Sequence, residues 1–201
     1  MDKLKISEMS GKMKGIPAIN TNPLSNAFCK KMNSSKAEGI ICKDCYSCAM
    51  LKAYRKNCVP AFERNTQMLK VSMEEQALPV FKKNDIVRLH AHGELINQEH
   101  LKNFMKTADK NPSITFSLYT KRSDIVNKVL EKETKPKNMI MVYSNPLVDK
   151  PITKVPKNFN KVFNVCRDEH MDKINCGARD CNTCRKCYKM NDAQIIYEKV
   201  K

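Results

Sequence analysis

The sequence predicts an α/β protein, built either as a partial (β/α) barrel or as an open, mostly parallel sheet. Short β-rich runs alternate with amphipathic helical runs through the middle of the chain, which is the rhythm of βαβ units. A chain of 201 residues is long enough for one domain, but it holds too few such units for a closed eight-stranded barrel. Cysteine-rich loops flank the alternating region on both sides.

The elements follow in chain order. Residues 1–28 are predicted to form an irregular lead-in, because glycine and proline interrupt them repeatedly. Residues 30–41 are predicted to form a loop excursion between the metal-ligating cysteines. Apolar residues at helical spacing then predict helices over 46–57 and 60–78. Strands are predicted over 86–90, 114–119, 139–143 and 162–165, and helices over 97–109, 123–133 and 192–199.

We expect these elements to form a single domain. Residues 1–58 contain the lead-in and a first cysteine cluster, residues 59–165 form the βα core, and residues 166–201 contain a second cysteine cluster and the closing helix. The ten cysteines are too many to be incidental. We expect the chain to have no signal peptide and no apolar run of membrane-spanning length. The cysteines then indicate metal binding or redox chemistry in the cytoplasm, with no membrane partner.

The first cluster contains a C-x2-C-x2-C run, and an earlier cysteine precedes it. Thiolates at this spacing can converge on one soft metal centre, as they do in iron–sulfur sites and, in pairs, in zinc sites. We predict a [4Fe–4S] cluster here, with a structural zinc as the alternative. Three thiolates would suffice if one iron stayed open, and the last cysteine of the run could instead be a buried side chain. The predicted ligands are Cys29, Cys42, Cys45 and Cys48.

The second cluster reads C-x4-C-x2-C-x2-C near the end of the chain. Neighbouring basic residues would offset the negative charge of a thiolate-bound cluster. We predict a second cluster here, with a zinc clip as the alternative, and we interpret Cys58 and Cys166 as ordinary buried thiols. The predicted ligands are Cys176, Cys181, Cys184 and Cys187.

A third motif, RLHAHGE over residues 88–94, ends the first predicted strand. The carboxyl ends of parallel strands are where ligands bind in α/β sheets. Gly93 would allow close backbone approach, Glu94 would accept hydrogen bonds from a ligand amine, and His92 would lie beside them as a cofactor-binding residue. His90 and His92 could equally be zinc ligands or polar loop residues.

The net charge of +16 comes from 37 basic and 21 acidic side chains. It fits either a lysine-rich solvated surface or contact with a polyanion such as nucleic acid.

The motifs resemble, in order, a phage and prophage protein group, the gene product 88 family. The motifs are Phe28-Cys29, ICKDCY, RLHAHGEL, FSLYTKR, YSNP and NCGARDCNTCRKCY. The resemblance implies a protein of a bacterial host's cytoplasm, with the first three cysteines as its shared N-terminal thiols. More distantly, the chain is similar to radical S-adenosylmethionine enzymes, which have a cysteine triad, a partial barrel and a Gly-Glu motif. That similarity implies that Glu94 contacts the methionine amine, although the family's usual triad spacing is C-x3-C-x2-C.

The sequence therefore predicts a phage-type iron–sulfur protein with redox or S-adenosylmethionine chemistry and an electron donor as partner. The alternative is a zinc-stapled, basic nucleic-acid-binding or regulatory protein.

Overall fold

The computed structural model describes residues 3–200 and consists of one open seven-stranded sheet with helices. The strands follow one another across the sheet in chain order; the first pair is antiparallel and every later pair is parallel. This confirms the predicted α/β class and the open, mostly parallel sheet. The strands are β1 (Ile6–Glu8), β2 (Pro17–Ile19), β3 (Ile86–Leu89), β4 (Thr115–Thr120), β5 (Met139–Val148), β6 (Lys161–Cys166) and β7 (Ile195–Lys199).

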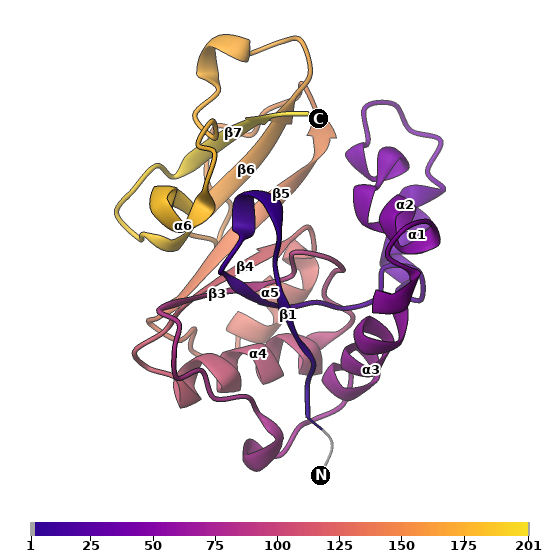
Figure 1. The fold of residues 1–201 in the computed structure, drawn as a ribbon. Coiled ribbons are helices and arrows are strands. Elements are labelled where there is room, and N and C mark those ends of the chain that lie inside the picture. Colours follow the sequence, from indigo (N-terminus) through magenta and orange to yellow (C-terminus); the bar gives the residue numbers. More distant parts are fainter. Residues whose placement is uncertain (1–2, 201) are drawn as a thin grey trace.

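Six α-helices are present in the part of the chain that the structure describes (Figure 1). They are α1 (Ala27–Asn33), α2 (Tyr46–Lys52), α3 (Val59–Leu69), α4 (Gln98–Lys110), α5 (Ser123–Leu130) and α6 (Cys181–Cys184). Short 3-10 turns lie at Gly11–Met13, Ile41–Asp44, Lys56–Cys58, Glu75–Ala77, Met171–Lys173 and Lys186–Tyr188.

The main core lies between one face of the sheet and the helices α4 and α5. Alternate residues of the central strands enter it, for example Val87 and Leu89 from β3 and Phe116 from β4. Leu101 and Phe104 of α4 are fully buried against them. This period-two pattern meeting an amphipathic helix is the arrangement that the sequence predicts for the βα core.

The opposite face of the sheet is covered by the C-terminal cysteine segment. Tyr188 packs on Ile86 of β3, and Cys187 packs on the cluster that contains Tyr119 and Ile140. A mostly parallel sheet needs cover on both faces, because its strands are apolar on both. A short, irregular segment thus covers the sheet face that a layer of helices covers in most α/β proteins.

Several sequence predictions are wrong in detail. The helix predicted over 46–57 ends at Lys52, and residues 30–33 of the predicted excursion belong to α1. Residues 1–28 are not an irregular lead-in, because they contain β1, β2 and the start of α1. The helix predicted over 60–78 ends at Leu69, where Asn103 Nδ2 donates hydrogen bonds to the carbonyls of Leu69 and Val71. Residues 195–199 form strand β7 rather than a helix, because their Ile-Ile-Tyr run pairs with β6 along its whole length.

In Figure 1 the helices α1 and α2 lie on one side of the sheet, and α6 lies on the other. The two cysteine segments are therefore on different sides of the molecule. Among residues 3–200 there is no helix with the length and apolar character needed to cross a bilayer.

Candidate functional site

The first cysteine group lies on the segment that connects β2 to β3. Cys29 belongs to α1, Cys42 to the turn Ile41–Asp44, and Cys45 caps the N-terminus of α2, which contains Cys48. All ten cysteines of the chain are free thiols. Cys48 is buried and the other three are half-buried.

The four thiols of this group are near enough to influence one another's ionisation. Burial is the main cause that raises the pKa of Cys29, and Glu94 and the other three cysteines raise it further. Burial and the neighbouring Cys45 raise the pKa of Cys48 to about 12. Burial also raises the pKa of Cys42, while the ammonium of Lys121 opposes that rise. A cation that binds here would reverse these shifts, because thiolates are the metal-binding form.

Buried asparagines fix the loop after β2 against the loop after β3. The Asn20 Oδ1 atom accepts hydrogen bonds from the backbone N–H groups of Ala91 and His92, at 3.0 and 2.9 Å. The Asn26 Oδ1 atom accepts from the N–H groups of Phe28 and Cys29 and so caps α1, while its Nδ2 donates to the carbonyl of Glu94 at 3.0 Å. Sequence analysis missed these residues; the run of asparagines directly after a short strand is the signal that could have found them.

Asn26 therefore orients Cys29 and connects it to the Glu94 loop. We expect Asn26→Ala to lower the free energy of unfolding by about 1–3 kcal/mol, since it removes a helix cap and leaves the Glu94 carbonyl unpaired. The variant should also speed the reaction of Cys29 with a thiol reagent. Asn26→Asp keeps the cap and loses only the donor, so its loss should be the smaller. Urea unfolding of both variants checks this, and equal losses would contradict it.

Glu94 is buried, at 4% exposure, and its carboxylate binds the loop that follows β4. Its Oε1 accepts from the N–H of Leu95 at 2.7 Å and from the hydroxyl of Thr120, and its Oε2 accepts from the N–H of Lys121 at 2.8 Å. Burial raises the pKa of Glu94, and the nearby ammonium of Lys121 opposes this. Of about four acceptor positions on a carboxylate, one on Oε2 is left for a ligand.

The neighbours of Glu94 have different surroundings. Gly93 has a φ of +94° and passes so close to Thr21 that an added Cβ would lie 2.1 Å from its Oγ1. His92 Nδ1 lies 2.8 Å from the Ser47 hydroxyl, between Cys45 and Cys48 in sequence, and burial lowers the pKa of His92 to about 4. His90 instead is buried, with its ring packed edge to face against that of His100.

The second cysteine group lies on the segment between β6 and β7. Cys181 and Cys184 begin and end α6, and Cys187 lies in the turn Lys186–Tyr188. The backbone N–H of Cys176 donates to the Tyr197 carbonyl at 2.9 Å. Burial raises the pKa of Cys176 to about 12, with Glu198, Cys187 and Cys181 adding to the rise and Lys12 opposing it.

Donors and cations that sequence analysis did not connect with the second group surround it. The Tyr119 hydroxyl donates to Cys187 Sγ at 2.7 Å, and the Arg88 guanidinium lies 3.2 Å from the centre of the Tyr119 ring. Arg88 lowers the pKa of Cys181 and Cys187, although burial raises both overall. The buried Lys161 ammonium donates to two backbone carbonyls and also lowers the pKa of Cys187. Arg88 and Tyr119 fall within the RLHAHGEL and FSLYTKR motifs, but only the sheet brings them and Lys161 under the cysteine segment.

The remaining two cysteines lie outside both groups. Cys58 packs beside Leu51 and Phe62, and Cys166 is fully buried at the end of β6. Within residues 3–200, no three His, Cys, Asp or Glu side chains are placed around a common point as ligands of one metal ion. The two groups, as described, are therefore not preformed sites for a single ion.

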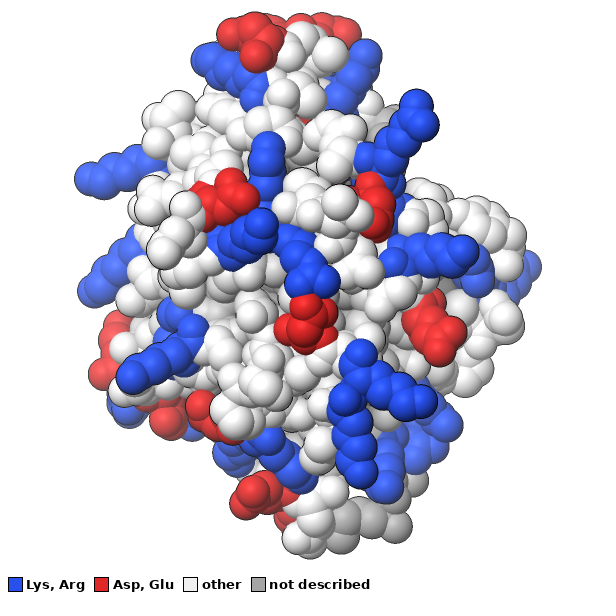
Figure 2. Space-filling model, turned by 60° about the vertical axis from the view of Figure 1, so that its left-hand side comes forward, with Lys and Arg blue, Asp and Glu red and all other residues white. Residues whose placement is uncertain are grey.

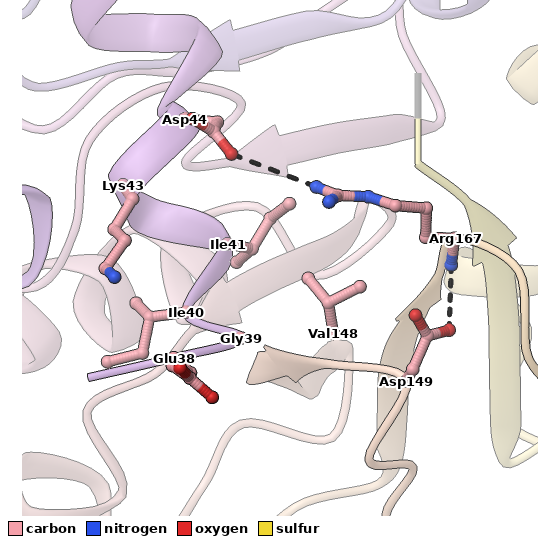
Figure 3. Close-up of a pocket in the computed structure, with 9 residues that line it drawn as sticks. All are labelled: Glu38, Gly39, Ile40, Ile41, Lys43, Asp44, Val148, Asp149 and Arg167. Carbon is pink, nitrogen blue, oxygen red and sulfur yellow. Dashed lines mark hydrogen bonds and ion pairs between the residues drawn. The ribbon is translucent and has the colours of Figure 1, made fainter. Parts of the chain in front are cut away.

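A surface hollow of about 330 Å³ lies beside the first cysteine group. Figure 3 shows Arg167 extended across it toward Asp44, at 3.9 Å, with its backbone N–H donating to the Asp149 carboxylate at 2.8 Å. Charges of both signs line the hollow, and neither Glu94 nor a thiol lies among the lining residues. The hollow is thus separate from the carboxyl ends of the parallel strands, where the sequence predicts that ligands bind.

Comparison with known proteins gives one match. A family model described as gene product 88 matches residues 3–197, which is nearly the whole chain. No curated protein and no solved structure matches the chain.

Proposed function

The chain belongs to the gene product 88 family, a phage protein family, and we propose that it is an iron–sulfur protein with two [4Fe–4S] clusters. The ligands of the N-terminal cluster are Cys29, Cys42, Cys45 and Cys48. The ligands of the C-terminal cluster are Cys176, Cys181, Cys184 and Cys187. Such clusters supply one-electron transfer. An electron donor from the host cytoplasm is the expected partner.

The grouping of the thiols carries this proposal. Within each group the cysteines act on one another's pKa, and the two cysteines outside the motifs lie elsewhere. In the N-terminal group, Cys29 lies in α1, well before the C-x2-C-x2-C run that contains the other three cysteines. The spacing of that run alone therefore does not explain why Cys29 lies beside it.

The cover of the second sheet face gives independent support. Residues 176–188 pack on the strands, yet they include only one short helix, α6, and few apolar side chains. Such a segment gains little from burial and needs a cross-link to stay ordered. A cluster bound by four thiolates would provide it, and the Tyr119 hydroxyl and Arg88 would offset its negative charge.

In the finer form of the proposal only Cys29, Cys42 and Cys45 bind the N-terminal cluster, which leaves one iron open, and the site also binds S-adenosylmethionine on a scaffold like that of the radical enzymes. The first cysteine group follows the first parallel strand, β2, and Gly93-Glu94 follows the next one, β3. The free acceptor position on Glu94 Oε2 would take the methionine amine, while Lys121 and Arg122 lie near enough to act on Glu94 and Cys29 electrostatically. His92, held by Ser47, would border the same site.

Metal and sulfide analysis of anaerobically purified protein tests the proposal. We expect about eight iron and eight sulfide per chain, with broad absorption at about 400 nm. Cys42→Ala with Cys45→Ala should remove about half of both, and Cys181→Ala with Cys184→Ala the other half, since each pair belongs to one site. Cys58→Ala and Cys166→Ala are matched controls and should keep the full content.

A colourless protein with stoichiometric zinc would overturn the iron–sulfur proposal and favour the zinc-stapled alternative. For the finer form, reduced protein should cleave S-adenosylmethionine to 5′-deoxyadenosine, and Glu94→Gln should weaken its binding. A full cluster content without cleavage would reject the enzyme and leave a redox sensor or a structural role.

A further inference from the structure

Two tyrosines form an exposed aromatic pair next to the first cysteine group. Tyr46 begins α2 and Tyr54 lies just after it, and their side chains are 64% and 65% exposed. Their hydroxyl oxygens are 2.7 Å apart, which fixes one ring relative to the other. Exposed aromatic side chains of this size are costly in water and mark interaction sites when they cluster.

The pair is anchored from below by a stack of rings. Tyr46 lies on His92, with ring centroids 6.3 Å apart and 30° between the planes, and His92 lies on Phe62, with centroids 5.7 Å apart and 25° between the planes. Phe62 is buried in a core cluster with Leu51. The outer rings are therefore held in place before any ligand arrives, so binding would cost little ordering entropy.

Positive charge surrounds these rings. Lys52, Arg55 and Lys56 are exposed, and residues 45–62 contain no acidic side chain. None of the three has an ion-pair partner among the described residues. Arg55 lies near enough to His92 to lower its pKa. The nearest acid after this run, Glu63, is engaged by Asn22, Ser25 and Gln67.

The overall charge of the protein does not single out this region. Figure 2 shows Lys and Arg spread over the face in view, with Asp and Glu between them. What distinguishes residues 46–56 is the combination of ordered, exposed rings with unpaired cations in a stretch, residues 45–62, that contains no acidic side chain. Phosphates need the cations, and unpaired bases need flat surfaces to stack on.

We propose that the surface formed by Tyr46, Lys52, Tyr54, Arg55 and Lys56 binds single-stranded nucleic acid. Bases stack on the tyrosine rings, and the phosphates between them contact the lysine and arginine side chains. An acidic protein would need only the charges, and a duplex keeps its bases inside, so neither would use the rings. None of these five side chains is a proposed metal ligand, so the proposal does not rest on metal at the neighbouring thiols.

Fluorescence anisotropy with labelled oligonucleotides tests this proposal. The probes are a 20-mer of dT, a 20-mer of U and a DNA duplex of the same length. We expect either single strand to bind more tightly than the duplex. Tyr54→Ala should weaken single-strand binding about 5- to 100-fold, the range for loss of one stacked base. Tyr54→Phe keeps the ring and should keep most of the affinity.

Variants that remove positive charge test the predicted phosphate contacts. Replacing Lys52, Arg55 and Lys56 by Gln should reduce the slope of log affinity against log salt by about 2, since each phosphate contact contributes ~0.7 on a single strand. The matched control replaces Lys128, Lys132 and Lys137, which are exposed on and after α5, and so removes the same charge elsewhere.

Tighter binding of the duplex, or equal effects of the two charge variants, would overturn the proposal. So would an unchanged affinity in Tyr54→Ala with an unchanged melting temperature. If the single strands do not bind but an acidic peptide does, and the Lys52 triple variant abolishes that binding, the surface is a protein-docking site instead. Because binding is measured on protein of known metal content, failure here is separable from failure of the iron–sulfur proposal.

Discussion

Replacing Gly93 by alanine is expected to lower the free energy of unfolding by about 3 kcal/mol or more. Two effects add together. The φ of +94° at Gly93 is a conformation that costs an L-residue about 1–3 kcal/mol. The new Cβ would also lie 2.1 Å from the Oγ1 and 2.6 Å from the carbonyl oxygen of Thr21, and the carbonyl belongs to the backbone. The loops after β2 and β3 would have to separate.

Gly11→Ala is the control for the first effect alone. Gly11 also has a positive φ, of +61°, but nothing lies within 4 Å of a Cβ built there. We expect it to cost about 1 kcal/mol. Urea unfolding followed by circular dichroism measures both variants. Equal losses of unfolding free energy in the two variants would mean that the loops can separate at no cost. The close contact between Gly93 and Thr21 would then not contribute to stability.

Acid should destabilise the protein in the range where histidines ionise, above the range of the carboxylates whose pKa values are lowered. Burial lowers the pKa of His90 to about 3 and lowers that of His100 far below its usual value, and it outweighs a contact of His90 with the backbone of Tyr119. The two rings lie edge to face, with centroids 4.9 Å apart, and both pack on Phe104. Neither His90 ring nitrogen has a hydrogen-bond partner within residues 3–200.

The sign follows from linkage. In the unfolded chain a histidine binds a proton below about pH 6.5, whereas these two stay neutral in the folded protein. Their contribution to stability is therefore complete above pH 6.5 and is lost as the pH falls, by about 1.4 kcal/mol per pH unit for each histidine. His92, whose pKa is lowered to about 4 by burial and by Arg88, adds to the same trend.

Urea unfolding between pH 7.5 and pH 5 measures this slope. In that window Asp85, Asp124 and Glu63, whose pKa values are lowered by hydrogen bonds, stay ionised and contribute little. The double variant His90→Phe, His100→Phe keeps rings in the core and should lose about two thirds of the slope. A wild-type slope in that variant would show that other groups cause the acid sensitivity.

The alternating core could be predicted from the sequence because its signals are local. β3, β4 and β6 and the helices α4 and α5 fall close to their predicted ranges, since each has a hydrophobic period that only one backbone conformation satisfies. β1 and β2, of three residues each, and β7 were missed. A strand of three residues has almost no period, and the five-residue β7 forms because it pairs with β6 along its whole length, which its own sequence does not reveal.

The cysteine spacings alone determined that this chain has two thiol-rich segments, and the Gly-Glu motif marked a strand end. Only the tertiary structure decided what lies around them. It placed Cys29 with the later triplet, turned His90 into the core but His92 toward Ser47, and brought Tyr119 under Cys187. These contacts join residues far apart in sequence, so their free energy depends on how the sheet and its loops pack, and no local pattern encodes it.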